Sequence, residues 1–164
     1  MSDLHVNFLG KTLAGPVVAA SGTFGFGEEY AAIEDLSLLG GISGKGLTLN
    51  GQPGNKGERL LETPSGLMNS IGLQNPGVDH FIRQELPVMK RLGTTAWANL
   101  GGHSVEEYCE GARRLSETDV DFIELNISCP NVRQGGLAYG VHCADASGVV
   151  SAVRACCTKP LVVK

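Results

Sequence analysis

The stretch Leu125-Asn126-Ile127-Ser128-Cys129-Pro130-Asn131 gives the first indication of both the fold and the site. Residues 120–125 are mostly apolar, and because this run is too short for a helix it predicts a buried strand. Pro130 favours extended backbone at Cys129, and Gln134-Gly135-Gly136 predicts a flexible loop. In α/β proteins the residues that follow the carboxyl ends of strands carry the chemistry. A thiol between two amides suits a small, polar, planar ligand there, and a structural cysteine beside turn-forming asparagines is the alternative.

The composition is that of an ordinary globular domain. The chain has 164 residues, 42% apolar and 18% charged, and this length predicts a single domain. Its 23 glycines, about twice the usual share of ~7%, favour tight turns and backbone-lined sites over long helices. A net charge of −4 gives no basic surface, so nucleic acid is not an expected partner. No apolar run approaches the ~20 residues of a membrane helix and no secretion signal is recognised, so we expect a cytoplasmic protein without a membrane anchor.

The cysteines and histidines predict no metal centre. The five cysteines form no CxxC pair, which indicates reduced thiols instead of a disulfide framework or a zinc site. The four histidines are scattered, with no HExxH motif.

Apolar runs and turn signals predict strands that alternate with helices. A short hairpin over residues 4–13, turning at Gly10-Lys11, precedes the first strand. Strands are expected at 16–20, 42–49, 94–100, 119–127 and 160–164, and helices at 28–39, 78–92, 104–116 and 146–157. Pro87 should kink or divide the second helix, and Ser104 with Glu107 has the spacing of a capping box at the start of the third.

Residues 50–77 are expected to form a long irregular segment, because Pro53, Pro64 and Pro76 interrupt it. Its central part, residues 63–73, is too apolar for a solvated linker, so we expect it to fold over another part of the protein.

This order of elements predicts a parallel sheet with right-handed crossovers. No GxGxxG follows the first strand, so the Rossmann fingerprint is absent. Each strand instead ends at a polar or small residue: Ser21, Lys45, Asn99, Asn126 and Lys164. Strand ends that face one way form the mouth of a (β/α)8 TIM barrel. Residues 1–164 would be the N-terminal part of that single domain, with a hairpin, about five strands and four helices, and with strands six to eight absent.

Several motifs in the order of one family resemble dihydroorotate dehydrogenase of class 1, the soluble FMN enzyme of pyrimidine synthesis. They are Ala20-Ser21-Gly22-Thr23-Phe24-Gly25, Lys45-Gly46-Leu47-Thr48, Asn69-Ser70-Ile71-Gly72-Leu73-Gln74-Asn75-Pro76-Gly77, Ala98-Asn99 and Glu124-Leu125-Asn126-Ile127-Ser128-Cys129-Pro130-Asn131. Together they span most of the chain. The form of the third motif is closer to class 1B than to class 1A.

The resemblance implies a role for each matching residue. The cysteine matching Cys129 is the general base that removes a proton from C5 of dihydroorotate, while a hydride from C6 passes to N5 of FMN. The substrate would be held by residues matching Lys45, Asn69, Ser70, Ile71, Gly72, Leu73, Asn126 and Asn131. FMN would be contacted by residues matching Ser21, Lys45, Gly46, Asn99, Asn126 and Lys164. Class 1B proteins pair with a second subunit that carries FAD and an iron–sulfur cluster, with NAD as final acceptor, and a homodimer is also expected.

The chemistry of these residue types agrees with the implied roles. Orotate is a planar carboxylate with amide edges, which asparagine side chains and the Lys45 ammonium suit. A cation such as Lys164 near N1 and O2 of a flavin would favour hydride acceptance. A free thiol with a pKa near ~8.5 is mostly protonated at neutral pH, so Cys129 needs activation or alkaline pH. In the structural alternative, Ser21 ends a strand and Asn69 and Asn99 form turns.

Two other functions remain open at this point. A flavin-dependent pyrimidine-ring reductase would share the barrel type and a cysteine acid/base, and it would not need a cation for a carboxylate. A catalytically inactive half-barrel fragment is the alternative from another class, because the usual phosphate site lies in loops after strands seven and eight.

Overall fold

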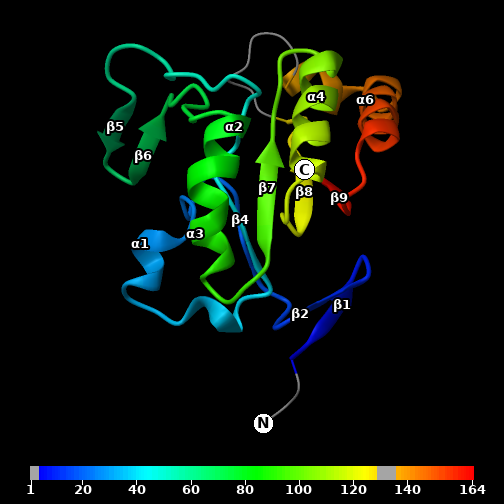
Figure 1. Ribbon diagram of the computed structural model, residues 1–164. Helices are drawn as coiled ribbons and strands as arrows, with labels where there is room; N and C mark the ends of the chain where they lie inside the picture. The colour runs from blue at the N-terminus through cyan, green and yellow to red at the C-terminus, as the bar shows by residue number, and fades with distance from the viewer. Residues whose placement is uncertain (1–3, 129–135) are drawn as a thin grey trace.

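Five parallel strands form the central sheet of the computed structural model, which describes residues 4–128 and 136–164 (Figure 1). Their order across the sheet is β3-β4-β7-β8-β9. The strands are β3 (Val18–Ala19), β4 (Gly41–Ser43), β7 (Ala96–Leu100), β8 (Phe122–Leu125) and β9 (Leu161–Val163). All five predicted strands are therefore confirmed, each shorter than the apolar run that indicated it.

The helices follow the strands in the predicted alternation. Between β3 and β4 lie α1 (Glu28–Ala31) and the 3-10 helix η1 (Leu36–Leu38). Between β4 and β7 lie α2 (Val78–His80), the π-helix η2 (Phe81–Glu85) and α3 (Leu86–Lys90). The last connections carry α4 (Val105–Ser116), α5 (Gly136–Val141) and α6 (Cys143–Cys156). Figure 1 shows α2, α3 and α4 running alongside β4, β7 and β8 on one face of the sheet.

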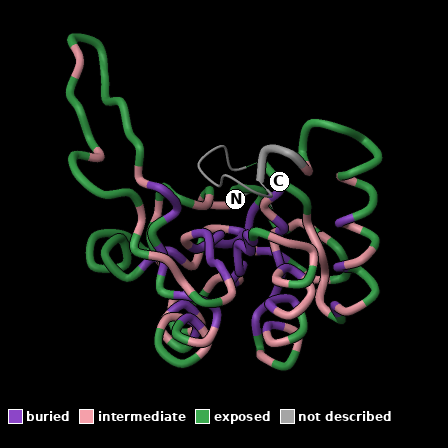
Figure 2. The backbone as a smooth tube through the Cα atoms, turned by 90° about the horizontal axis from the view of Figure 1, so that it is seen from above, coloured by how far each residue is buried: buried purple, intermediate pink, exposed green. Residues whose placement is uncertain are grey.

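The main core lies between this face of the sheet and the helices. Alternate strand residues, including Ala98, Leu100 and Ile123, are fully buried in the same cluster as Phe81 and Tyr108 from the helices. Figure 2 shows these buried positions concentrated at the centre of the molecule. Burying a large apolar side chain is worth about 1.5–3 kcal/mol, so this cluster is the main source of stability.

The N-terminal hairpin packs on the opposite face of the sheet. It consists of β1 (Val6–Phe8) and β2 (Lys11–Leu13), paired antiparallel. The Phe8 ring lies 5.8 Å from that of Trp97 and 5.7 Å from that of Phe122, centroid to centroid. The hairpin is confirmed, but its turn is Leu9-Gly10, with φ of 47° and 83°, because Lys11 already belongs to β2.

Pro87 interrupts the second helix as predicted. Proline lacks an N–H group and its ring clashes with the carbonyl four residues earlier. The π-helical turn η2 ends at Glu85, two residues before Pro87, and α3 then runs from Leu86 to Lys90. At the start of α4, the Ser104 hydroxyl accepts a hydrogen bond from the Glu107 N–H at 3.3 Å, which confirms the predicted cap.

Two expectations between β3 and α2 are wrong. The helix predicted over 28–39 ends at Ala31, because Ile33 stays exposed and Asp35 caps the separate helix η1. The segment 50–77 is not irregular throughout, since it forms the hairpin β5 (Leu60–Thr63) and β6 (Gly66–Asn69).

This second hairpin does not fold over the rest of the protein. Both views show it extending away from the sheet (Figures 1 and 2). Its four large apolar side chains are exposed: Leu60, Leu61, Leu67 and Met68. The flexible loop predicted to reach Gly136 is also wrong at that residue, where α5 begins; the other two residues of that loop lie outside the described residues.

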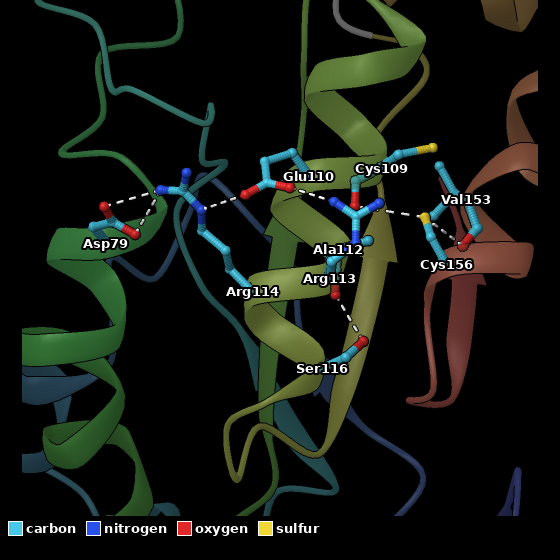
Figure 3. Close-up of polar contacts among 9 residues, drawn as sticks. All are labelled: Asp79, Cys109, Glu110, Ala112, Arg113, Arg114, Ser116, Val153 and Cys156. Atoms are coloured by element: carbon cyan, nitrogen blue, oxygen red, sulfur yellow. Dashed lines mark hydrogen bonds and ion pairs between the residues drawn. The ribbon is translucent and has the colours of Figure 1, made fainter.

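Polar contacts join the outer surfaces of the helices. Arg114 on α4 donates to Asp79 on α2 at 2.9 Å and to Glu110 one turn earlier at 2.9 Å (Figure 3). These bonds fix α4 against α2. In the described part of the chain, no helix has the length and apolar character needed to cross a membrane.

Candidate active site at the carboxyl ends of the strands

The residues predicted to end the strands lie along one edge of the sheet. Asn99 is the penultimate residue of β7, Asn126 directly follows β8, and Lys164 directly follows β9. Ser21 and Lys45 each lie two residues beyond the ends of β3 and β4. Because all five strands are parallel, their carboxyl ends meet at the same edge. This placement is the one that a shared site requires.

Asn99 and Glu124 point away from the helices and contact each other. Their neighbours along β7 and β8 fill the helix-side core, and side chains alternate between the two faces of a strand. The Asn99 amide donates to the Glu124 carboxylate, which also accepts a hydrogen bond from the Ser43 hydroxyl at 2.8 Å. Asn99 is fully buried, so this network fixes its side chain.

Glu124 had not been identified as a site residue. The sequence feature that could have identified it is a charged residue inside the otherwise apolar run Phe122-Ile123-Glu124-Leu125. An ionisable group in such a strand needs hydrogen-bonding partners, because burial of an unpaired polar group is costly.

Three hydrogen bonds fix the position of Asn126. Its amide nitrogen lies 3.5 Å from Asn99 Oδ1, and its side-chain oxygen accepts from the Ser128 N–H at 3.3 Å. Its backbone carbonyl accepts from the Tyr108 hydroxyl of α4 at 2.7 Å. The two asparagines therefore form one preorganised pair of amides at the strand ends.

Gly46 lies where two side chains approach the backbone. A Cβ atom at this position would be 2.8 Å from Asn99 Oδ1 and 2.9 Å from Leu73 Cδ1. Leu73 also contacts Gly101, where a Cβ would lie 3.5 Å from its other methyl group. The absence of a side chain at Gly46 thus lets the loop around Leu73 seat against the strand ends.

The loop Ser70–Asn75 is bonded through its carbonyl groups. The Ile71 carbonyl accepts from the Asn55 N–H at 3.0 Å, and the Leu73 carbonyl accepts from the Asn75 side chain at 2.8 Å. Gly72 and Leu73 both have positive φ, 74° and 50°, which is unusual for a leucine. Within the described residues, no acceptor pairs with the N–H groups of Ile71, Gly72 and Leu73. Unpaired backbone N–H groups are the kind of donor that forms anion-binding concavities.

Lys45 faces a large cavity. Its N–H donates to the Gly25 carbonyl at 3.0 Å, which orders the residue after β4. It lines a cavity of about 990 Å³ together with Gly25, Phe26, Gln52 and Gln74, among others. Glu29 and Glu85 line the same cavity. Within residues 4–128 and 136–164, no hydrogen bond or ion pair engages the Lys45 ammonium group.

The remaining predicted residues are not all brought together. Asn69 is exposed on β6, opposite Leu60, and makes no side-chain hydrogen bond to other described residues. The Ser70 hydroxyl accepts from the Asn55 amide at 2.9 Å. Cys129 and Asn131 lie outside the described residues.

A pair of thiols elsewhere does not resemble a reactive centre. Cys156 on α6 donates to the Cys109 carbonyl of α4 and to the Val153 carbonyl, at 3.5 and 3.3 Å (Figure 3). Burial, followed by the neighbouring Cys156, raises the pKa of Cys109 to about 11, which keeps it a neutral thiol. No cluster of His, Cys, Asp or Glu suited to a metal occurs in the part of the chain that the structure describes.

Comparison with known proteins points to one family. The family model for dihydroorotate dehydrogenase matches residues 3–164. The chain is 52% identical over 164 residues to the catalytic subunit of dihydroorotate dehydrogenase B (NAD+) of Petrotoga mobilis, and 48% identical over 165 residues to that of Bacteroides thetaiotaomicron. Both matches cover 100% of this chain but only 55% and 54% of the relatives. The chain thus spans about half the length of the curated relatives it matches.

A solved structure shares the fold. The crystal structure of DHODH from Eimeria tenella in complex with ferulenol matches with a TM-score of 0.69 and 20% sequence identity. The match covers 93% of this chain and 43% of that protein. The five-stranded parallel sheet and its helices therefore have the arrangement of part of that larger fold.

Proposed function

Because this chain belongs to the dihydroorotate dehydrogenase family, we propose that the protein containing it oxidises dihydroorotate to orotate with FMN, as a step of pyrimidine biosynthesis. One observation carries the proposal beyond the family name. The Asn99–Asn126 pair and Gly46 lie together at the carboxyl edge of the sheet, and the Leu73 side chain of the Ser70–Asn75 loop packs beside Gly46. Carboxyl strand ends are where parallel α/β proteins bind their ligands.

The substrate is an anion with a planar amide ring. The N–H groups of Ile71, Gly72 and Leu73, with the Lys45 ammonium, suit its carboxylate. The amide side chains of Asn126 and of the predicted residues Asn69 and Asn131, with the Ser70 hydroxyl, suit the ring edges, since each of these groups both donates and accepts. A bare pyrimidine lacks the carboxylate, so this donor set favours dihydroorotate over uracil or thymine.

The residues at the strand ends also fit FMN. Gly46 lies directly beside Asn99 and Leu73, since a Cβ there would be 2.8 Å from Asn99 Oδ1 and 2.9 Å from Leu73 Cδ1. Ser21, Lys45, Asn99, Asn126 and Lys164 supply hydroxyl, amide and ammonium groups for the polar edge of the flavin and its negative charge. When bound, FMN would supply the capacity to accept a hydride.

Cys129 would act as the general base at C5 of the substrate. The proposal rests on its position in the sequence, three residues after Asn126 in the motif that resembles the family. A thiol is mostly protonated at neutral pH, so turnover should rise with pH until the thiolate predominates.

The remaining proposals concern the whole protein. We propose that residues 1–164 are the N-terminal part of a single (β/α)8 barrel that the rest of the protein completes. The name of the relatives, catalytic subunit of dihydroorotate dehydrogenase B (NAD+), supports a partner subunit that passes electrons to NAD. We expect FAD and an iron–sulfur cluster on that subunit, and a homodimer of the catalytic subunit.

The test uses the full-length protein and its Cys129→Ser variant. The purified protein should show a flavin spectrum and oxidise dihydroorotate, with little reduction of uracil or thymine. Cys129→Ser should keep flavin and orotate binding but lose roughly 10²–10⁴-fold in turnover at pH 7, with partial recovery at high pH. A colourless protein would overturn the FMN proposal, and normal turnover of the variant at pH 7 would exclude Cys129 as the base.

A further inference from the structure

We propose that Gln52 is a positioning residue that holds the substrate loop Ser70–Asn75 in its binding geometry, with His103 fixing the orientation of its amide. This inference rests on the proposed function, because it assigns a task to the loop that would bind the substrate anion. Gln52 itself belongs to none of the predicted site motifs.

Gln52 is bonded to the loop through both its backbone and its side chain. Its N–H donates to the Asn75 carbonyl and its carbonyl accepts from the Asn75 N–H, each at 2.9 Å. Its side-chain Nε2 donates to the Gly72 carbonyl at 2.5 Å. Gln52 is thus hydrogen-bonded to the loop at its end, at Asn75, and near its centre, at Gly72.

The Gly72 carbonyl and His103 together fix the orientation of the Gln52 amide. The Gly72 carbonyl can only accept a hydrogen bond, so the NH2 group of the amide must face it. The amide oxygen must then face His103, whose Nε2 lies 3.1 Å from it and must carry a proton. A protonated imidazole also carries this proton, so the contact survives in either charge state.

His103 is itself anchored to the sheet and to α4. Its backbone N–H donates to Glu107 Oε2 at 2.8 Å, within the capped first turn of α4. Two residues earlier, the Gly101 N–H donates to the Leu47 carbonyl at 2.7 Å. The chain of contacts therefore connects the strand ends of β4 and β7 to the substrate loop.

The Gln52 side chain bonds to the loop at Gly72, where two consecutive residues have positive φ. Gly72 and Leu73 have positive φ, a backbone conformation that is unfavourable for a non-glycine residue such as Leu73. The bond to the Gly72 carbonyl fixes the peptide plane whose N–H belongs to Leu73. Losing it should misorient a donor for the substrate while leaving the flavin-side residues Asn99 and Asn126 in place.

The test compares Gln52→Glu, Gln52→Ala and the control Gln84→Glu in the full-length protein. A carboxylate at position 52 still accepts from His103 but repels the Gly72 carbonyl. Gln52→Glu should raise KM for dihydroorotate by at least roughly 10-fold, the effect of one lost hydrogen bond. It should change kcat much less and retain FMN. Gln52→Ala should show a smaller rise, and Gln84→Glu, the same charge change on the exposed surface of η2, should show none.

A second pair of variants and an activity-independent measurement complete the test. His103→Ala should raise KM in the same direction, and His103→Gln, whose amide can donate to Gln52, should restore it. Amide hydrogen exchange at Ser70 and Asn75, the loop residues whose N–H groups are hydrogen-bonded, should be faster in Gln52→Glu than in wild type. An unchanged KM, or equal loss of substrate and FMN, would overturn the proposal. Failure of the wild type to oxidise dihydroorotate would instead refute the proposed function, whatever the exchange result.

Discussion

The Lys164 ammonium donates a hydrogen bond to the Ser21 hydroxyl, although 143 positions separate the two residues. Ser21 follows β3 and Lys164 follows β9, the two edge strands of the described sheet. In a flat sheet these strands would lie ~19 Å apart, since neighbouring strands are spaced by ~4.8 Å. The contact therefore requires a curved sheet whose edges approach each other at the carboxyl end. Both residues were assigned to the flavin by resemblance, and the curvature brings them together.

The first prediction concerns Lys164. In the full-length protein, Lys164→Ala should weaken FMN retention by roughly 10-fold, because the proposed flavin site would lose a charge-assisted hydrogen bond. Lys164→Arg should retain most of the binding, since it keeps the charge. The ratio of flavin to protein absorbance after gel filtration measures both effects. Stoichiometric flavin in Lys164→Ala at low concentration would place Lys164 outside the flavin site.

The second prediction concerns Asp121, which joins the N-terminal hairpin to the sheet and to α3. Its carboxylate accepts from Lys11 at 2.7 Å, from Lys90 at 2.8 Å and from the Ala96 N–H at 3.0 Å. Asp121→Asn should lower the free energy of unfolding of the full-length protein by about 2 kcal/mol, because two ammonium groups lose their shared anion. Chemical denaturation measures the loss, and Asp119→Asn, an exposed neighbour, is the control.

The stabilisation by Asp121 should depend on pH. Burial alone would raise the pKa of Asp121, but the hydrogen bonds from Lys11, Lys90 and the Ala96 N–H outweigh it and hold the pKa below its ordinary value of 3.8. A carboxyl with a lowered folded pKa stabilises the fold above its unfolded pKa and loses that effect as pH falls. The stability difference between wild type and Asp121→Asn should therefore be full near pH 6 and shrink below about pH 4. A difference that grows on acidification would contradict this.

The third prediction concerns thiol reactivity. With a pKa raised to about 11 by burial and by Cys156, only about one Cys109 thiol in a thousand is ionised at pH 8. Cys143 is exposed. Iodoacetamide at pH 8 should therefore label Cys143 at least roughly 10-fold faster than Cys109, as followed by peptide mass spectrometry. Unfolding in urea should remove the difference, and equal rates in the folded protein would show that Cys109 is not protected.

Much of the fold could be predicted because most strands are short, largely apolar segments and glycine, proline or polar residues separate them from the helices. The helix at 28–39 failed because its apolar residues do not all face the core, and Ile33 and Leu38 remain exposed. The hairpin at Leu60–Asn69 was missed because apolar residues on both of its faces give no alternation.

The site could be located from sequence, but its internal contacts could not. The position of Lys45 and Asn99 near the carboxyl ends of their strands could be predicted from the order of strands and helices along the chain. The bonds of Glu124 to Ser43 and of Gln52 to Gly72 depend on the register between distant segments, which local patterns do not specify.

The last prediction concerns residues 1–164 expressed alone. Within the described residues, β3 and β9 each have one unpaired edge, and Val17, Leu38 and Val163 beside them are exposed. An apolar cavity of about 420 Å³ also lies open next to β3. Unpaired apolar edges promote association, and these carry none of the inward charges that protect natural edge strands. We therefore expect the fragment to self-associate, aggregate or remain partly unfolded, and to hold FMN weakly. Size-exclusion chromatography with a flavin absorbance trace tests this, and a sharp monomer peak with stoichiometric FMN would show that the five-stranded unit is self-sufficient.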